Sequence, residues 1–456
     1  MTTGLPLSLR ASWGLGGLGA TSMLYLINLF VVFYLVRHVG MPAAIAGTLL
    51  AITRIYDAVI DPLIGTLSDR SQSRWGKRRP LMFAGALLST AGCVAVFNLP
   101  SMNIGPALYV FALAALLLYC TGYSLFAIPY MAQGAEMTND YAERATLMAW
   151  RTFFVYTAGI VITAGAPALI AALGGKKDAY ALMSVAAAVV VGATMLWVVA
   201  ATGKAPALSP GIGTSTPAAS YRSALKNKPF LVILLVKMTL QLGTAFIGAA
   251  FLFFLSDVLR RGESALALFG LASNLVGVAA VPLWNRALRT IERRSLAIAL
   301  FAALGLVNLS WLFAVPSEPQ VFLLLRAVLS GALGSGSVLV AMAMLADTIE
   351  YDRLCSKEQR GGLFVGLFEL MQTTSFVLGP LIVGFAFSAA GMISGDAGRG
   401  AQPQSAVDMT RYAVALVPAA CQLLGIGLIM LYKLDADTLA RLRDADRPQP
   451  AAGAPA

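Results

Sequence analysis

The sequence predicts an all-α membrane protein with twelve transmembrane helices, and its composition and hydropathy pattern are the basis for this. The 456 residues are 58% hydrophobic and only 12% charged, and the mean hydropathy is +0.76. Soluble domains carry about 25% charged residues, so this composition argues strongly against a water-soluble enzyme of this size. The apolar residues gather in stretches long enough to cross about 30 Å of hydrocarbon as helices.

Twelve such stretches are expected as membrane spans, each of about 20–29 residues. Gly and Pro inside several of them are tolerated, because neighbouring helices can satisfy freed backbone groups. The stretches are Trp13–Val36, Ala43–Ser68, Leu81–Leu99, Ala107–Met131, Trp150–Leu173, Tyr180–Ala201, Phe230–Leu255, Ala265–Trp284, Ser295–Val315, Val321–Leu345, Leu363–Gly391 and Tyr412–Leu434.

The basic residues predict the orientation of these spans. An even number of spans places both termini on one side, and that side would hold 22 of the 33 Lys and Arg residues. Short cytoplasmic loops are the positive ones, so both termini are expected in the cytoplasm of a bacterial-type inner membrane. The net charge of +11 is then explained by topology and by contact with anionic lipid, and nucleic-acid binding is not expected.

The chain is expected to divide into two related six-helix halves. A faint repeat supports this, because Glu136–Arg144 follows the fourth span and Asp347–Arg360 follows the tenth, each starting with an acid and ending with an Arg. Two such halves joined by a cytoplasmic loop are typical of transporters. The expected parts are an N-terminal half (1–201), a linker rich in Pro, Gly and Ser (202–229), a C-terminal half (230–434) and a disordered tail (435–456).

The most informative local pattern lies in the second span. Arg54, Asp57 and Asp61 are spaced to share one helix face. One charge at the centre of a membrane helix costs about 2.5–3.5 kcal/mol, so these side chains should face the bundle interior or a water-filled cavity. Two neighbouring carboxylates favour a shared cation or proton, which would make a coupling-ion site. The alternative is a structural ion pair between Arg54 and Asp57.

The second span and the loop after it also resemble a known family. The matching residues are Asp57, Asp61-Pro62, Gly65, Asp69-Arg70 and Arg74-Trp-Gly-Lys-Arg-Arg-Pro80. They closely resemble the signature of the glycoside–pentoside–hexuronide cation symporters of the major facilitator superfamily. Further segments are similar to that family's helix 10–11 loop, helix 4 and helix 5, namely Met344–Tyr351, Ala127–Tyr130 and Trp150–Phe154.

This resemblance implies a secondary active transporter that moves a small solute by cation-coupled symport and alternating access. A sugar or sugar acid is the expected solute, with a non-sugar amphipathic or lipid-like solute as the alternative. The expected partners are the solute, the coupling cation and the bilayer, and a monomer is expected. The resemblance implies neither enzymatic activity nor a cofactor.

The resemblance assigns cation coupling to Asp57, Asp61 and Ser124. The family's helix 4 aspartate is replaced by Ala127, and a helix 2 asparagine of sodium-using relatives by Ile60. Sodium needs several oxygen ligands, whereas a proton needs one carboxylate. We therefore expect proton coupling, if the protein is ion-coupled.

The candidates for solute binding come from both halves. Arg151 matches the family's helix 5 arginine and could hold an anionic solute or pair with Asp57 and Asp61. Glu369 could carry a proton or form a fixed bridge with Lys237, which could instead snorkel to the surface. The full candidate set is Thr21, Tyr25, Met131, Arg151, Lys237, Gln241, Glu369, Gln372 and Thr373.

Gating is assigned to charged residues at the cytoplasmic ends of the helices. Asp69 is expected to pair with Arg70 and Arg74 in one conformation, and Asp347 is the candidate in the other half. The alternative is that the basic loop only anchors the topology.

Enzymatic chemistry lacks candidate residues in the sequence. There is one histidine, His38, and no His/Cys/carboxylate cluster with metal-ligand spacing, so no metal site is expected. No phosphate-binding loop is present. The four cysteines form no CxxC pair and are predicted to be small core residues.

Overall fold

The computed structural model describes residues 5–100, 103–138, 140–206, 227–356, 361–395, 402–432, 434 and 441–442. Within these residues, twelve helical segments are long and apolar enough to cross a membrane, which confirms the predicted fold class. The expected linker and tail lie mostly outside the described residues.

Two sets of six segments follow one another along the chain. The first six segments are α1 (Leu7–Gly14) continuing through α2 (Gly16–Leu26), η1 (Ile27–Val31) and α3 (Val32–Arg37); α4 (Ala43–Arg70); α5 (Arg79–Phe97); α6 (Pro106–Glu136); α7 (Tyr141–Ile160) continuing through η2 (Val161–Gly165) and α8 (Ala166–Ala172); and α9 (Lys177–Ala201). The last six segments are α11 (Lys228–Phe253) with η4 (Phe254–Val258); α12 (Glu263–Thr290); α13 (Arg293–Leu309) with η5 (Ser310–Phe313); α14 (Gln320–Ser356); α15 (Gly361–Ala389); and α16 (Gln404–Val414) with α17 (Leu416–Met430).

Several helices are longer than the apolar stretches that predicted them. α7 begins at Tyr141 rather than Trp150, and α14 continues past Leu345 to Ser356. Hydropathy marks only the part of a helix that lies in hydrocarbon, whereas backbone hydrogen bonds can continue the same helix into water. The sequence therefore predicted the membrane spans correctly, but not the residues at which their helices begin and end.

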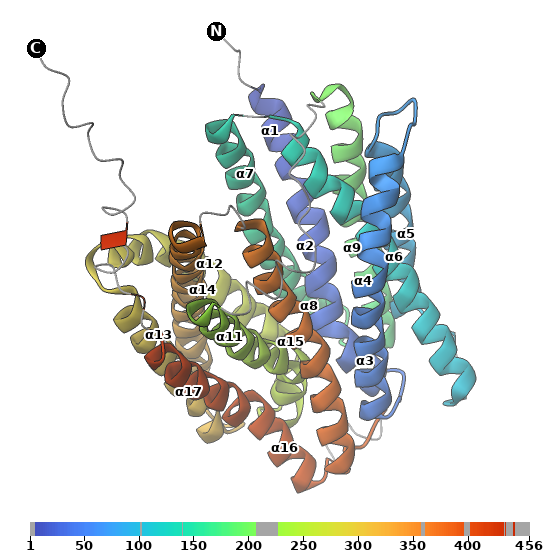
Figure 1. The fold of residues 1–456 in the computed structure, drawn as a ribbon. Coiled ribbons are helices and arrows are strands. Elements are labelled where there is room, and N and C mark those ends of the chain that lie inside the picture. Colours follow the sequence, from blue (N-terminus) through green and yellow to red (C-terminus); the bar gives the residue numbers. More distant parts are fainter. Residues whose placement is uncertain are drawn as a thin grey trace, which may run out of the picture.

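The two sets form two groups of helices that pair reciprocally (Figure 1). α4, from the second segment of the first group, packs against α15, from the fifth segment of the second group. α8, from the fifth segment of the first group, packs against α12, the second segment of the second group. Reciprocal contacts of this kind are expected where a two-fold axis relates two repeats.

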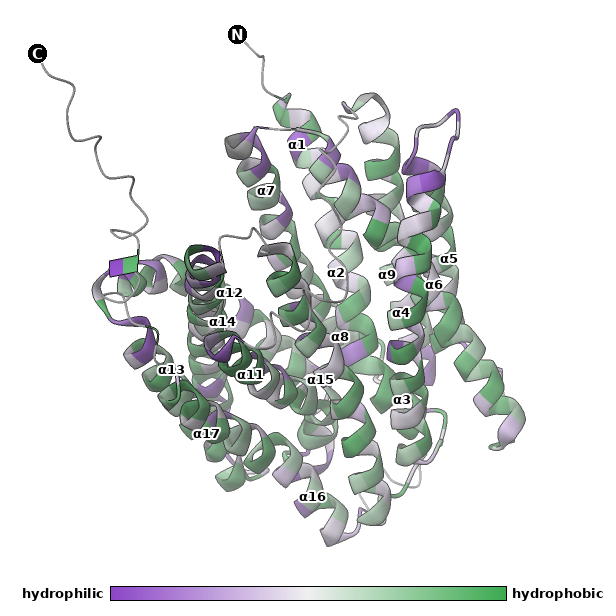
Figure 2. Cartoon of the chain, in the orientation of Figure 1, coloured by the Kyte–Doolittle hydropathy of each residue, from purple (hydrophilic) through white to green (hydrophobic). Residues whose placement is uncertain are grey.

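The two ends of the bundle are named here by their loops. The basic end holds Leu7 and the loop 71–78, and Figure 2 shows hydrophilic residues gathered in that loop. The opposite end holds the connections at residues 38–42, 174–176, 259–262 and 390–395.

Hydrogen bonds join the two groups at the opposite end. The backbone N–H of Gly395 donates to the carbonyl of Val36 over 2.8 Å. The backbone N–H of Ala44 donates to Oγ of Ser388, also over 2.8 Å. The backbones of the two groups therefore meet at this end.

Glycines allow α4 and α15 to cross closely there. A Cβ on Gly384 would lie 2.4 Å from the carbonyl oxygen of Ala43, and a Cβ on Gly47 would lie 2.4 Å from that of Pro380. Real Cβ atoms essentially never come this close to another atom, so only glycine fits at these two positions. The close crossing of α4 and α15 depends on them.

Nearer the basic end, the same two helices carry exposed apolar side chains. On α4, Leu63 and Leu67 are 57% and 56% exposed, and on α15, Val365 and Leu370 are 45% and 48% exposed. Figure 1 shows α15 leaning away from α4 toward this end. The two groups therefore converge at the opposite end and diverge toward the basic end.

A valine at Gly384 is expected to keep the opposite end from closing, because its Cβ would meet the backbone of Ala43. The measurement is oxidative cross-linking of an Ala44→Cys/Ser388→Cys pair with the exposed Cys355 replaced by Ser. We expect a severalfold lower yield of disulfide in Gly384→Val. Gly366→Val on the same helix is the matched control, since no atom lies within 4 Å of its Cβ position. Equal yields in both variants would contradict the role of Gly384.

Candidate functional site

Two carboxylates lie midway along α4 and face α6. Asp57 is 7% exposed, and Oδ1 of Asp57 and Oδ1 of Asp61 are both buried without an aligned hydrogen bond. Cys120 and Ser124, one turn apart on α6, face Asp57 and Asp61 respectively. Oγ of Ser124 is also buried without an aligned hydrogen bond. The structure thus brings the three residues of the expected cation site together, and their role stays a prediction.

Arg54 connects this cluster to the first membrane segment. Its Nη1 lies 3.3 Å from Oδ2 of Asp57, and its Nη2 donates to Oδ1 of Asn28 over 2.9 Å. Asn28 lies in η1, a π-helical turn, and such turns often occur at functional sites. The structural ion pair considered from the sequence therefore exists, but it uses Oδ2 of Asp57 and leaves Oδ1 without a partner.

Three residues of the cluster were not identified from the sequence. Tyr123 on α6 interacts electrostatically with both aspartates and with Arg54 and Arg151. Cys120, predicted to be only a core residue, is buried and faces Asp57. Both could have been found by asking which residues lie near Ser124 on its helix. Asn28 had a weaker signal, as a polar side chain in an apolar span.

Arg151 lies on α7 near the cluster but forms no ion pair with a described residue. It packs against Gly17 of α2, whose Cβ position is 3.1 Å from Cγ of Arg151, and it faces the hydroxyl of Tyr130. Its Nε is buried without a partner. The ion pair of Arg151 with Asp57 or Asp61 is therefore not formed among the described residues of this structure.

The remaining candidates of the first group are partly accessible. Thr21 is half-buried on α2, and Tyr25 on the same helix is 36% exposed. Tyr25 interacts electrostatically with Tyr156 of α7. Met131 on α6 is 37% exposed. Their roles in solute binding stay predictions.

In the second group, Lys237 binds to α15. It is 4% exposed, donates to Oε1 of Gln372 over 3.0 Å and lies 4.6 Å from the ring centroid of Phe368. Glu369 interacts with it electrostatically, but no direct ion pair forms between these two described residues. Lys237 therefore neither snorkels nor forms the fixed bridge to Glu369.

The other candidates of this group lie on the same two helices. Gln241 is one turn from Lys237 on α11 and is 8% exposed. Thr373 directs its hydroxyl to the carbonyl of Glu369 over 3.5 Å. The expected residues of α11 and α15 are thus neighbours, and their role in binding stays a prediction.

The ion pairs of Asp69 in the basic loop differ from the expected ones. Asp69 pairs with Arg78 over 2.6 Å and with Lys77 over 3.9 Å, rather than with Arg70 or Arg74, which are exposed. The loop turns at Gly76, whose φ of 96° favours glycine, and this turn brings Arg78 back over the end of α4. The partner of Asp69 is therefore set by the turn and not by proximity in sequence.

The same arrangement occurs in both groups at the basic end. Arg78, just before α5, also pairs with Glu136 at the end of α6 over 2.5 Å. In the second group, Arg293, the first residue of α13, pairs with Asp347 of α14. Each ion pair joins helices of one group, and the two acids are those with which the sequence repeat begins.

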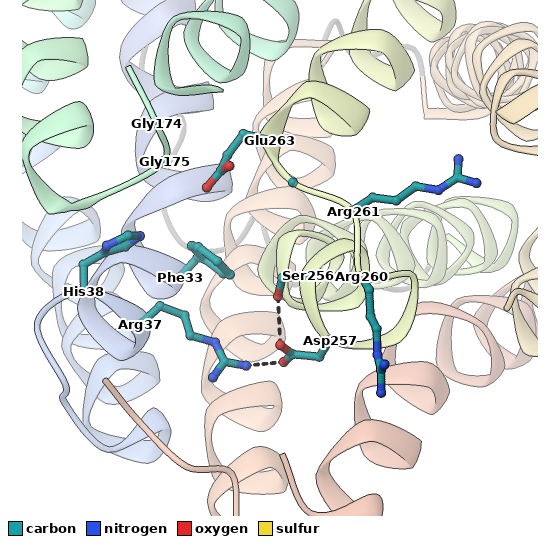
Figure 3. Close-up of a pocket in the computed structure, with 11 residues that line it drawn as sticks. Phe33, Arg37, His38, Gly174, Gly175, Ser256, Asp257, Arg260, Arg261 and Glu263 are labelled. Carbon is teal, nitrogen blue, oxygen red and sulfur yellow. Dashed lines mark hydrogen bonds and ion pairs between the residues drawn. The ribbon is translucent and has the colours of Figure 1, made fainter. Parts of the chain in front are cut away.

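The opposite end holds an ion pair between the groups. Arg37 at the end of α3 pairs with Asp257 in η4, and both side chains are almost fully buried. Arg37 also donates to the carbonyl of Ile393 over 3.2 Å and lies 5.5 Å from the ring centroid of Phe253. The pair lies in a pocket of about 400 Å³ that both groups line. Figure 3 shows Phe33, Arg37 and His38 of the first group facing Ser256, Asp257 and Glu263 of the second.

Comparison with known proteins identifies the family. Residues 12–436 match the family described as MFS/sugar transport protein. The chain belongs to this family. It is therefore a membrane transporter of the major facilitator superfamily and not an enzyme, as the sequence predicted.

Relatives of this transporter align along nearly its whole length. The inner membrane symporter YicJ of Escherichia coli K12 is 26% identical, with 91% of this chain and 89% of that protein covered. The isoprimeverose transporter of Lactiplantibacillus pentosus is 26% identical, with 94% and 89% covered. The glucuronide carrier protein homolog of E. coli K12 is also 26% identical, with 89% and 88% covered. The resemblance to the glycoside–pentoside–hexuronide symporters is confirmed.

Solved structures agree in fold. The nucleoside transporter NupG matches with a TM-score of 0.65 at 13% identity, covering 94% of this chain and 99% of that one. A bacterial homologue of the lysosomal transporter Spinster, solved in an inward-facing and occupied conformation, matches with a TM-score of 0.62 at 14% identity, covering 98% of both chains. At these identities the likeness shows the fold of the transporter alone.

Removing the acceptor for Lys237 is expected to destabilise the transporter. In Gln372→Leu the buried ammonium loses its hydrogen bond, and bonds to charged groups contribute about 1.5–3 kcal/mol. We expect a lower Tm of the purified protein in detergent. Gln372→Glu, which keeps an acceptor, should not lower it. An unchanged Tm in Gln372→Leu would show that the bond does not hold Lys237.

Proposed function

We propose that this transporter carries out proton-coupled symport of a sugar or sugar acid by alternating access. The observation that supports it most is the cluster of Asp57, Asp61 and Ser124, where one oxygen of each side chain is buried without an aligned hydrogen bond and Cys120 and Ser124 face the two carboxylates. Burying an unpaired polar group is costly, and a carboxylate in a membrane helix is functional by default. A cation or proton bound at this cluster would satisfy it.

The composition of the cluster favours a proton over sodium. Hard metal cations in proteins generally take about six or more oxygen ligands. The described cluster offers Oδ1 of Asp57, Oδ1 of Asp61 and Oγ of Ser124, and Cys120, which faces Asp57, presents sulfur where a further oxygen ligand would be needed. Thiols suit soft metals rather than sodium. A proton needs only one of the two carboxylates.

The way the two groups meet supports alternating access. They are joined at the opposite end by the Arg37–Asp257 ion pair and by the close crossing of α4 and α15. The pairs Arg78–Glu136 and Arg293–Asp347 at the basic end lie within groups and leave each free to move as a body. With the basic end in the cytoplasm of an inner membrane, this is an inward-facing state.

The guanidinium group of Arg151 favours a solute that carries an anionic or strongly hydrogen-bonding group. It has no ion-pair partner among the described residues, although it lies near the buried charges of α4. The guanidinium group recognises carboxylates with two parallel hydrogen bonds. Relatives named for isoprimeverose and for glucuronides make a sugar or a sugar acid the solute to test first.

The coupling role of the aspartates is tested by uptake into proteoliposomes. Wild-type protein should accumulate labelled isoprimeverose or a glucuronide under an imposed proton gradient, and a sodium gradient should add nothing. Asp57→Asn and Asp61→Asn should each abolish gradient-driven uptake but retain counterflow, because an amide imitates the protonated, loaded carrier. Asp178→Asn, at an exposed acid of α9, is the matched control.

Two results would contradict this function. Full gradient-driven uptake in both aspartate variants would show that Asp57 and Asp61 serve only to stabilise the structure and do not couple transport. Accumulation of a labelled lysolipid, without any uptake of glycosides, pentosides or hexuronides, would favour the amphipathic-solute alternative.

The proposed orientation is tested with a reporter fused after Ser215, in the expected linker. The fusion should give a cytoplasmic signal, because the positive-inside rule places the basic end there. The measurement is a paired alkaline phosphatase and fluorescent-protein fusion at this one site. Phosphatase activity without fluorescence would show that the orientation is the reverse of the one proposed.

A further inference from the structure

The one histidine of the chain lies at the opposite end, beside the ion pair that bridges the two groups. His38 follows Arg37 directly, is half-buried and lines the pocket of about 400 Å³ between the groups (Figure 3). The proposed function gives it no role. Histidine is the side chain whose charge ordinarily changes between about pH 5 and pH 8, so its surroundings decide whether this pocket responds to pH.

Three aromatic rings of the first group surround the imidazole. The ring centroid of His38 lies 4.4 Å from that of Tyr180 on α9. The rings of Tyr34 and Phe33 on α3 lie 5.9 and 6.0 Å away. Aromatic rings attract a cation within about 6 Å of their centroids, so they favour a charged imidazole. These rings belong to the same group as His38, and their contribution is present whether the opposite end is closed or open.

The second group adds two carboxylates to this pocket. Asp257 in η4 pairs with Arg37, the residue before His38. Glu263, the first residue of α12, accepts a hydrogen bond from the hydroxyl of Tyr180 over 3.2 Å, which is a further polar contact between the groups. Figure 3 shows Glu263 and His38 reaching into the pocket from the two groups. Both carboxylates are held here only while the opposite end is closed.

A turn with two glycines in the first group makes room for Glu263. Gly174 and Gly175 have φ of 85° and 65°, a conformation that favours glycine. A Cβ on Gly175 would lie 3.1 Å from Oε2 of Glu263, which is tighter than most real Cβ contacts. The carboxylate of Glu263 is therefore seated against the backbone of the first group, next to Tyr180.

Opening of the opposite end would change the electrostatic surroundings of His38. The carboxylates of Asp257 and Glu263 would leave with the second group, and Arg37 would lose its ion-pair partner. An unpaired Arg37 would repel a charge on the neighbouring imidazole. Both changes disfavour the charged form, so a proton binds to His38 more tightly in the closed state. By linkage, that proton favours closure by the same factor.

The other charged groups at this end do not reverse the effect. Residues 176–178, two lysines and an aspartate, belong to the same group as His38 and stay with it in both states. In the second group, Arg260 is exposed, and Arg261 donates to the carbonyl of Glu318. Figure 3 shows both guanidinium groups directed away from His38. Water and salt screen their repulsion, whereas the two carboxylates contact the neighbours of His38 directly.

We infer that His38 is a pH sensor for the opposite end: acid charges it beside Glu263 and the Arg37–Asp257 pair and holds this end closed, and a higher pH releases it. The change is expected near pH 6.5, the ordinary range of histidine, above the pH at which the two carboxylates themselves gain protons. With the opposite end outside the cell, an acidic medium would keep the transporter closed to the outside. This inference goes beyond the proposed function, because it requires neither a solute nor a coupling cation.

The test follows the separation of the two groups at the opposite end as a function of pH. Spin labels are attached in an Asn103→Cys/Ser317→Cys variant, at two exposed residues in connections of the first and the second group, with the exposed Cys355 replaced by Ser. The purified protein is frozen in detergent at values from about pH 5.5 to about pH 8, and pulsed EPR gives the distance distribution. We expect the ratio of closed to open protein to fall about fivefold or more over this range, a typical size for coupling between sites.

Four variants in this labelled background identify the source of the pH dependence. His38→Gln stays neutral and should give the same low closed fraction throughout the range. His38→Lys stays charged and should remain closed at the upper end of the range. Glu263→Gln should reduce the dependence by about half or more, because the hydroxyl of Tyr180 keeps an acceptor while the charge is lost. Asp178→Asn, at an exposed acid that stays with His38, is the matched control and should retain the full dependence.

The inference fails if the protein that keeps His38 shows no change over this range, or if acid opens the opposite end. It also fails if the dependence survives in His38→Gln, or if Glu263→Gln responds as strongly as the protein with Glu263. Loss of closure in both His38→Gln and His38→Lys would show that the imidazole only packs against its aromatic neighbours, which would overturn the role of its charge. None of these results decides the proposed symport function, because uptake in the variants of Asp57 and Asp61 is measured separately.

Discussion

The cost of placing a charge in hydrocarbon is the constraint on which the rest of this structure depends. A charged side chain at the centre of a membrane helix costs about 2.5–3.5 kcal/mol, and the chain bears this cost at only a few positions. Lys237 has an amide acceptor, and Arg54 has a carboxylate and an amide. Asp61 and Arg151, by contrast, have no ion-pair partner among the described residues. Glu369 in the second group also forms no direct ion pair, but its side chain is exposed, so the buried part of the incomplete pairing lies in the first group of helices, beside α4.

The ion pairs also show which helices are held together within each group and where the two groups are held to each other. Arg78–Glu136 and Arg293–Asp347 each join helices of one group, so they stay intact when the groups rotate against each other. Arg37–Asp257 joins the two groups and must break if the opposite end opens. The sequence predicted gating charges at the basic end, but among the described residues the ion pair that bridges the two groups lies at the opposite end. Arg37 and Asp257 were not identified because each lies next to a loop, where a charge carries little information.

Features that the membrane itself imposes could be predicted from the sequence, whereas features that depend on how helices pack could not. The membrane imposes a length and polarity on every span, so twelve spans were visible, and the charges of α4 stood out against an apolar background. Side-chain partners were harder to predict, because periodicity shows which residues share a face but not which helix that face meets. Asp69 was assigned to Arg70 and Arg74, whereas the turn at Gly76 brings Arg78 to it.

The first membrane segment connects the proposed cation site with the closed end. Asn28 in η1 accepts from Arg54, which pairs with Asp57, and Arg37 ends the same segment nine residues later, about 13.5 Å along the axis. Neutralising Asp57 would remove the attraction that holds the guanidinium between Asp57 and Asn28. The hydrogen bond from Arg54 to Asn28 of η1 would then weaken. η1 belongs to the same membrane segment as Arg37, the arginine of the ion pair with Asp257. Under the proposed coupling, a proton bound at α4 would act on the closure of the opposite end through this one helix, which is the connection that coupled transport requires.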